Sequence, residues 1–109
     1  MVTGAVRAET LKGHLDLLLL AIVADEPAHG YRIIEELKRR SSGAFVLPEG
    51  TVYPALHRLE QSGLLTSSWA TRSGRRRRVY ELTARGRRAL AGARRDWRGF
   101  AKAVEAVVT

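Results

Sequence analysis

Residues 66–83 predict a β-hairpin whose tip is strongly basic. The segments TSSWAT and RRVYELT alternate between apolar and polar residues and carry residues that favour strands, including Trp69, Val79 and Tyr80. Ser73 and Gly74 lie between these segments and supply the turn. Arginine precedes the turn at position 72 and follows it at positions 75–78. Successive side chains of a strand point to opposite faces, so about half of these arginines can contact one surface at once.

Three helices are predicted before the hairpin. The first covers about Thr10–Ala24, with Thr10 as its N-cap. The second covers about His29–Arg40 and ends in the Ser-Ser-Gly sequence that follows it. The third begins near Gly50 and ends before Gly63, a residue type that favours the end of a helix. A last helix is predicted over residues 84–108, after the hairpin.

The third helix has one side for packing and another that packing does not need. Val52, Leu56 and Leu59 recur at intervals of four and three residues, which predicts one buried stripe. Pro54 is tolerated because it lies in or just past the first turn. The other side carries polar groups that can meet base edges or phosphates: Glu49, Thr51, Tyr53, His57 and Arg58.

This order of elements predicts a mainly α fold with a small β-hairpin, a winged helix-turn-helix. Its DNA-binding domain would cover residues 1–83, and residues 84–109 would form a C-terminal dimerisation helix within the same compact unit. In this fold the second helix of the helix-turn-helix pair enters the DNA major groove. The wing arginines, Arg75, Arg76, Arg77 and Arg78, would contact phosphates and the minor groove. Lys12 and His14 would together help to bind a phosphate near the start of the first helix.

The charge distribution favours a polyanionic partner. The formal net charge is +8, and it falls in residues 48–109, because six basic and six acidic side chains cancel in residues 1–47. Nucleic acid is the first candidate and an acidic membrane the second. Residues 15–24 (LDLLLLAIVA) are too few to span a bilayer, so we expect no membrane partner. The absence of cysteine suits a cytoplasmic protein and excludes thiolate metal sites.

The sequence does not predict an enzyme. It shows no Ser/His/Asp set, no paired carboxylates and no phosphate-binding glycine loop. The three histidines lack the spacing of metal ligands, so we expect no metal and no other cofactor. An RNA-associated or ribosome-associated basic module remains the alternative. The helix-turn-helix order favours duplex DNA, because the major groove of A-form RNA is too narrow for side chains to enter.

The last helix carries one apolar stripe that predicts an interface. Its members recur at steps of three and four residues: Leu90, Ala93, Trp97, Phe100, Ala101, Val104, Val107 and Val108. Gly86, Gly92 and Gly99 should each cost this helix about 1 kcal/mol relative to alanine. A helix with this handicap needs packing, and a second copy of the chain can supply it. From spacing alone, Trp97 is a large apolar filler of the stripe, and Trp69 anchors the first strand of the hairpin.

Four segments resemble the PadR-like transcriptional regulators in order and spacing. They are LKGHLDLLLLAIVA, HGYRIIEEL, PEGTVYPALHRLEQSGLL and GRRRRVYELTARG. The resemblance covers nearly the whole chain and implies the compact branch of the family, which has a single C-terminal helix. It implies a homodimer that binds a pseudo-palindromic operator in double-stranded DNA, usually as a repressor that a small ligand releases.

The resemblance also assigns residues. Tyr31, Thr51, Tyr53, His57 and Arg58 fall where the family contacts DNA, and residues 74–78 match its wing. In the compact branch, a tryptophan at the place of Trp97 meets its symmetry mate and binds flat aromatic ligands between the two rings. The other residues that would line this ligand site are Leu17, Ala21 and Ala101. A regulator without a small-molecule effector remains an alternative.

Overall fold

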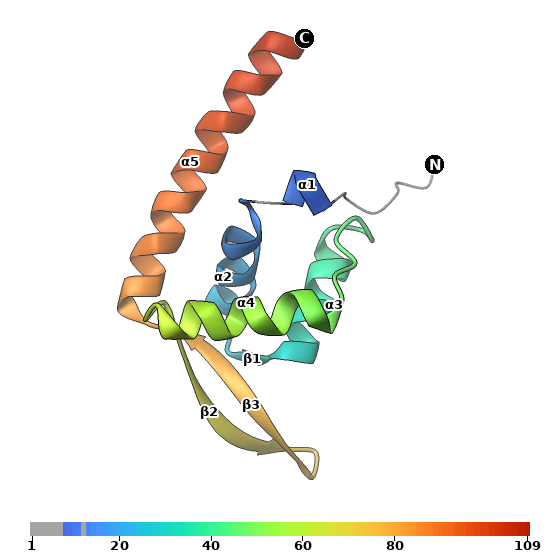
Figure 1. Ribbon diagram of the computed structural model, residues 1–109, viewed down its shortest axis with the longest axis vertical. Helices are drawn as coiled ribbons and strands as arrows, with labels where there is room; N and C mark the ends of the chain where they lie inside the picture. The colour runs from blue at the N-terminus through green and yellow to red at the C-terminus, as the bar shows by residue number, and fades with distance from the viewer. Residues whose placement is uncertain (1–7, 12) are drawn as a thin grey trace.

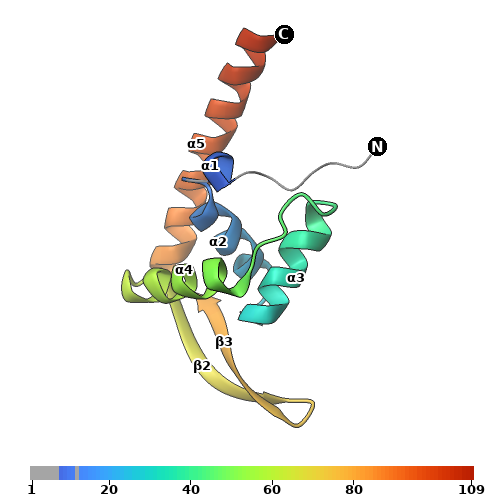
Figure 2. The same cartoon turned by 45° about the vertical axis from the view of Figure 1, so that its right-hand side comes forward.

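The computed structural model describes residues 8–11 and 13–109. Its elements follow the order α1 (Ala8–Leu11), α2 (Leu15–Asp25), β1 (Ala28–His29), α3 (Gly30–Arg40), α4 (Glu49–Gln61), β2 (Leu65–Arg72), β3 (Arg75–Leu82) and α5 (Ala84–Val108). Helices α2, α3 and α4 form the body, the β2–β3 hairpin extends from one end of it, and α5 extends the opposite way (Figure 1 and Figure 2). The predicted mainly α architecture with a hairpin and a long last helix is confirmed.

The described strands form one antiparallel sheet in the order β1-β3-β2. The turn of the predicted hairpin is confirmed: Ser73 and Gly74 connect β2 to β3 with φ angles of +52° and +75°, in the left-handed region that a tight two-residue turn requires. Strand β1 was not predicted. Its two residues pair with Tyr80 and Val79 of β3, so β1 fastens the start of α3 to the hairpin.

The core lies where α2, α3, α4 and the base of the sheet meet. Its most fully buried members come from all of these elements: Leu19, Ile33, Val52, Leu56, Leu59 and Leu65. The apolar stripe predicted for the third helix is therefore confirmed, with every member no more than 1% exposed. Burying a side chain of this size contributes about 1.5–3 kcal/mol. This burial fixes which side of α4 remains available to solvent.

The predicted first helix is broken into two. Thr10 lies inside α1 rather than at an N-cap, and α2 begins only at Leu15. Gly13 lies between them with φ +86°, a left-handed conformation that ends the first turn and turns the chain. The N-cap position of α2 is His14, whose side chain makes no capping hydrogen bond. Periodicity alone could not locate this break because apolar residues continue on both sides of it.

Gly86 permits the start of α5 to lie against the connection between α4 and β2. A Cβ at position 86 would overlap the backbone carbonyl of Leu64. The predicted cost of glycine therefore does not apply here, because alanine cannot fit without moving the backbone. Thr83 caps this helix, because its hydroxyl accepts a hydrogen bond of 3.0 Å from the Gly86 amide.

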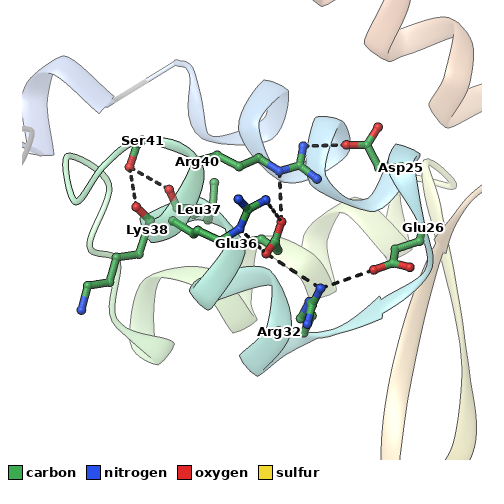
Figure 3. Close-up of polar contacts among 9 residues, drawn as sticks. Asp25, Glu26, Arg32, Glu36, Leu37, Lys38, Arg40 and Ser41 are labelled. Carbon is green, nitrogen blue, oxygen red and sulfur yellow. Dashed lines mark hydrogen bonds and ion pairs between the residues drawn. The ribbon is translucent and has the colours of Figure 1, made fainter.

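An ion-pair network fastens α3 to the end of α2 (Figure 3). The Glu36 carboxylate accepts two hydrogen bonds of 2.9 Å from Arg39 and one of 3.2 Å from Arg40. Arg40 also pairs with Asp25 at 2.6 Å. The hydrogen bonds from Arg39 are the main cause that lowers the pKa of Glu36 to about 2. The network therefore stabilises the fold above the ordinary carboxyl pKa of 4.5 and loses its effect as the pH falls through about 2.

Helix α5 packs on the body through its first half and, at its middle, through the contact of Trp97 with His14. Leu90 is 3% exposed, whereas the apolar residues further along the helix remain open to solvent. They are Trp97, Phe100, Val104, Val107 and Val108, which are between 41% and 85% exposed. Figure 1 shows the C-terminal end of α5 extending beyond the body. No helix in the described part of the chain is long and apolar enough to cross a membrane.

Candidate DNA-binding surface

The predicted contact residues of α4 lie on the side of the helix that the core does not use. All of them are at least partly exposed to solvent: Thr51, Tyr53, His57 and Arg58. Pro54 is exposed as well, and α4 runs through it from Glu49 to Gln61 without a break. Its missing N–H falls on the solvent side, where water can satisfy the carbonyl that loses its partner.

Two tyrosines gather where α3 begins. The ring of Tyr53 lies so close to Gly30 that a Cβ added to Gly30 would be 2.5 Å from the ring. Tyr31, the next residue of α3, is 51% exposed. The start of α3 and the first half of α4 thus present two phenol groups on neighbouring elements. The sequence predicted both as contact residues but did not predict that Tyr53 packs on the backbone of α3.

Arg58 is held by a carboxylate of α2. Its Nη2 lies 2.6 Å from Oδ1 of Asp16 and its Nη1 donates to Oδ2 at 3.0 Å. Hydrogen bonds to the Asp16 carboxylate raise the pKa of Arg58 further above its ordinary value. Both side chains remain about half exposed, so solvent weakens the pair. A bidentate pair still restricts the guanidinium to one orientation, with its Nε edge unused by Asp16.

The hairpin, which we call the wing (residues 65–82), divides its arginines between two faces. Arg78 lies opposite Trp69 in the register, and the Arg76 and Arg78 guanidinium carbons lie 4.8 and 5.3 Å from the centre of the Trp69 ring. Arg77 points to the other face, where its Nη1 is 3.4 Å from Nδ1 of His29. The predicted alternation is confirmed, and the four arginines do not form one uniform patch.

His29 connects the wing with α3, a role that the sequence did not predict. Its Nδ1 accepts a hydrogen bond of 3.2 Å from the Arg32 amide and so caps α3. Burial, followed by the charge of Arg77, lowers the pKa of His29. The neutral imidazole with an unprotonated Nδ1 is thus the form that fits both contacts. A histidine directly before the first turn of a helix is a weak sequence signal for a cap.

The residues predicted to bind a ligand only partly come together. Leu17 and Trp97 line an apolar pocket of about 340 Å³ between α1, α2 and α5. The remaining lining residues are Thr10, Leu11, His14, Leu18 and Phe45, whereas Ala21 and Ala101 are not among the described residues that line it. The His14 and Trp97 rings meet edge to face, 5.6 Å apart. Lys12, predicted to bind a phosphate, lies outside the described residues.

Helices α3 and α4 with the basic wing define a winged helix-turn-helix protein, a class in which the second helix of the pair enters the major groove. Residues 19–92 match the Transcriptional regulator PadR-like family, and the chain belongs to this family. It is a DNA-binding transcriptional regulator and not an enzyme.

Relatives of known sequence and structure agree with this assignment. The chain is 46% identical over 88 residues to Transcriptional regulator Rv3488 of Mycobacterium tuberculosis, and this match covers 81% of the chain and 79% of the relative. A PadR family transcription regulator from Clostridium difficile is 32% identical, with a TM-score of 0.78 over 89% of this chain and 100% of that one. A transcriptional regulator from Clostridium thermocellum has the same fold, with a TM-score of 0.85 at 24% identity over 94% of this chain and 100% of that one.

Proposed function

We propose that this protein is a homodimeric repressor that binds a pseudo-palindromic operator in double-stranded DNA. The observation that carries the proposal is the arrangement of exposed polar side chains on α4 beside a wing that carries Arg75–Arg78. In this proposal α4 lies in the major groove, and the wing contacts phosphates and the minor groove. The base-contacting residues are those of the two helices: Tyr31, Thr51, Tyr53, His57 and Arg58. Lys12 adds a phosphate contact, and the protein acts in the cytoplasm, where its DNA is.

Selection from a pool of random duplexes tests this proposal directly. After several rounds at about 0.15 M salt, the retained duplexes should share two inverted half-sites whose centres are about one helical turn, or 34 Å, apart. Binding to the selected duplex should be at least about 10³-fold tighter than binding to random DNA. Enrichment of no common sequence, or stronger binding to RNA than to duplex DNA in competition, would rule out an operator-binding regulator.

Helix α5 is the dimerisation element in this proposal, and residues 1–83 are the DNA-binding domain. Five apolar side chains of α5 remain exposed along one stripe: Trp97, Phe100, Val104, Val107 and Val108. A contiguous apolar patch of this kind on a small protein is typical of an interface. A two-fold axis beside this stripe would pair two identical surfaces and present two copies of α4 to one palindrome.

We further propose that a small planar aromatic molecule releases the repressor from DNA. The support is the apolar pocket of about 340 Å³, which Leu17 and Trp97 line. Ala21 and Ala101 would join this site only where the partner chain brings its own α5 alongside. Stacking on Trp97 would add about 0.5–1.5 kcal/mol to the binding of a flat ring.

Tryptophan emission tests the effector. In a Trp69→Phe variant, Trp97 is the remaining tryptophan, so quinoline and naphthalene derivatives that enter the pocket should quench it saturably. The same concentrations should release the selected duplex, because a ligand shifts DNA binding only when it prefers one shape of the dimer. A Trp97→Ala variant, which keeps Trp69, serves as the control, and the same compounds should not quench its emission. Quenching that leaves DNA affinity unchanged would argue for a regulator without a small-molecule effector.

A further inference from the structure

Trp69 is a large aromatic side chain in an unusual place. It was expected to anchor the first strand of the wing, but its ring is 54% exposed and its neighbours are arginines of the other strand. A tryptophan that is about half exposed gains less stability from burial than a core tryptophan does, so its contacts with these arginines or with a partner carry more of its role. Both guanidinium groups lie within the distance of about 6 Å at which a cation is attracted to an aromatic ring.

The two arginines on Trp69 belong to a continuous series of contacts that begins at α4. The Glu60 carboxylate, in the last turn of α4, accepts a hydrogen bond of 2.6 Å from the Ser67 hydroxyl. Ser67 in turn accepts a hydrogen bond of 2.8 Å from Nε of Arg78, which lies over the Trp69 ring. Arg76 lies over the same ring, nearer the turn. This series fixes the face of the wing from its base almost to its tip.

Arg76, the member of the series nearest the turn, has N–H groups that no described residue engages. Arg78 is engaged by Ser67 and lies 3.9 Å from Glu60, whereas Arg76 makes no hydrogen bond or ion pair with the described residues. The ring restricts where the Arg76 guanidinium can lie without using its N–H groups, since cation–π contact uses the flat face of the group. A fixed pair of cations beside an exposed ring matches the narrow, phosphate-lined minor groove.

We propose that Trp69 is a DNA-contacting residue that also positions Arg76 and Arg78. Its ring holds the two guanidinium groups side by side and enters the minor groove with them. The proposal rests on the proposed function, since it assumes that the wing contacts duplex DNA. It adds a residue that no pattern of charge or polarity in the sequence predicts as a contact. It also distinguishes Arg76 and Arg78 from Arg77, which lies on the opposite face beside His29.

The emission of Trp69 itself is the decisive measurement. In a Trp97→Phe variant, Trp69 is the remaining tryptophan. Titration with a duplex of about 25 base pairs should change its emission saturably, with the same midpoint as the anisotropy of a labelled duplex. Trp69→Ala in the wild-type background should weaken DNA binding about 10-fold, which is the scale of one lost aromatic stack. It should also reduce the salt slope, because released arginines hold phosphates less well.

Two variants separate contact from folding. Trp69→Phe keeps a ring under the arginines and should recover most of the lost affinity. Ser68→Ala changes the adjacent residue on the other face of β2 and should bind as wild type does. Thermal unfolding of each variant checks that the fold persists. The inference alone would be overturned if the protein binds duplex DNA without a change in Trp69 emission and Trp69→Ala binds as tightly as the wild type. A wild type that binds no duplex would instead overturn the proposed function. Stronger quenching by single-stranded RNA than by duplex DNA would also overturn the inference.

Discussion

Replacing Val104 by aspartate should raise the dissociation constant of the dimer at least about 100-fold. Val104 lies in the exposed apolar stripe of α5, between Phe100 and Val107. In the proposed dimer the variant would place two carboxylates, one from each copy, in an apolar interface. Burying an unpaired charge costs several kcal/mol, so this estimate is conservative. Light scattering from about 1 to 100 μM should show a dimer for the wild type and a monomer for Val104→Asp.

Ala91→Asp is the matched control for this measurement. Ala91 is exposed and lies on the opposite side of the same helix, so the variant adds an identical carboxylate outside the stripe. It should dimerise as the wild type does. A wild type that stays monomeric at 100 μM, or a Val104→Asp variant that still dimerises, would contradict the assignment of α5 as the interface.

Local sequence rules predicted the elements that local interactions determine. The hairpin follows from strand-forming residues around Ser73 and Gly74, and α5 begins where Thr83 can cap it. Strand β1 could not be predicted in the same way. A strand of two residues is too short to show a periodic pattern. Strand β1 forms because Ala28 and His29 pair with the free edge of β3, about fifty positions further along the chain.

The candidate site shows the same division. Exposure on α4 and the alternation of the wing arginines follow from helix and strand periodicity. The contacts that orient these side chains do not follow from periodicity. Asp16 reaches Arg58 from 42 positions away, and Tyr53 packs against the start of α3 because two helices cross there. Such pairings depend on tertiary packing, which single-sequence patterns do not specify.

Replacing Arg75, Arg76, Arg77 and Arg78 together by alanine should weaken binding to operator and random DNA alike, by about 30-fold at 0.15 M salt. Each phosphate contact contributes a slope of about 0.9 in the salt dependence of binding, or roughly fivefold in affinity between about 0.15 and 1 M salt. The alternation of the arginines between two faces limits the loss to about two contacts. The salt slope should therefore fall by about 1.8, rather than by the 3.6 or so that four independent contacts would give.

His57→Ala distinguishes a wing contact from a contact to bases. His57 is exposed on α4, the helix that we assign to the major groove, so its loss should reduce discrimination between the selected duplex and random DNA with little change of the salt slope. The wing variant should lower the salt slope and leave the discrimination between the two duplexes unchanged, because phosphates carry no sequence information. Anisotropy of labelled duplexes at several salt concentrations measures both quantities. Unchanged affinity and slope in the wing variant would mean that these arginines are a solvated loop, and a loss of discrimination would mean that the wing contacts bases.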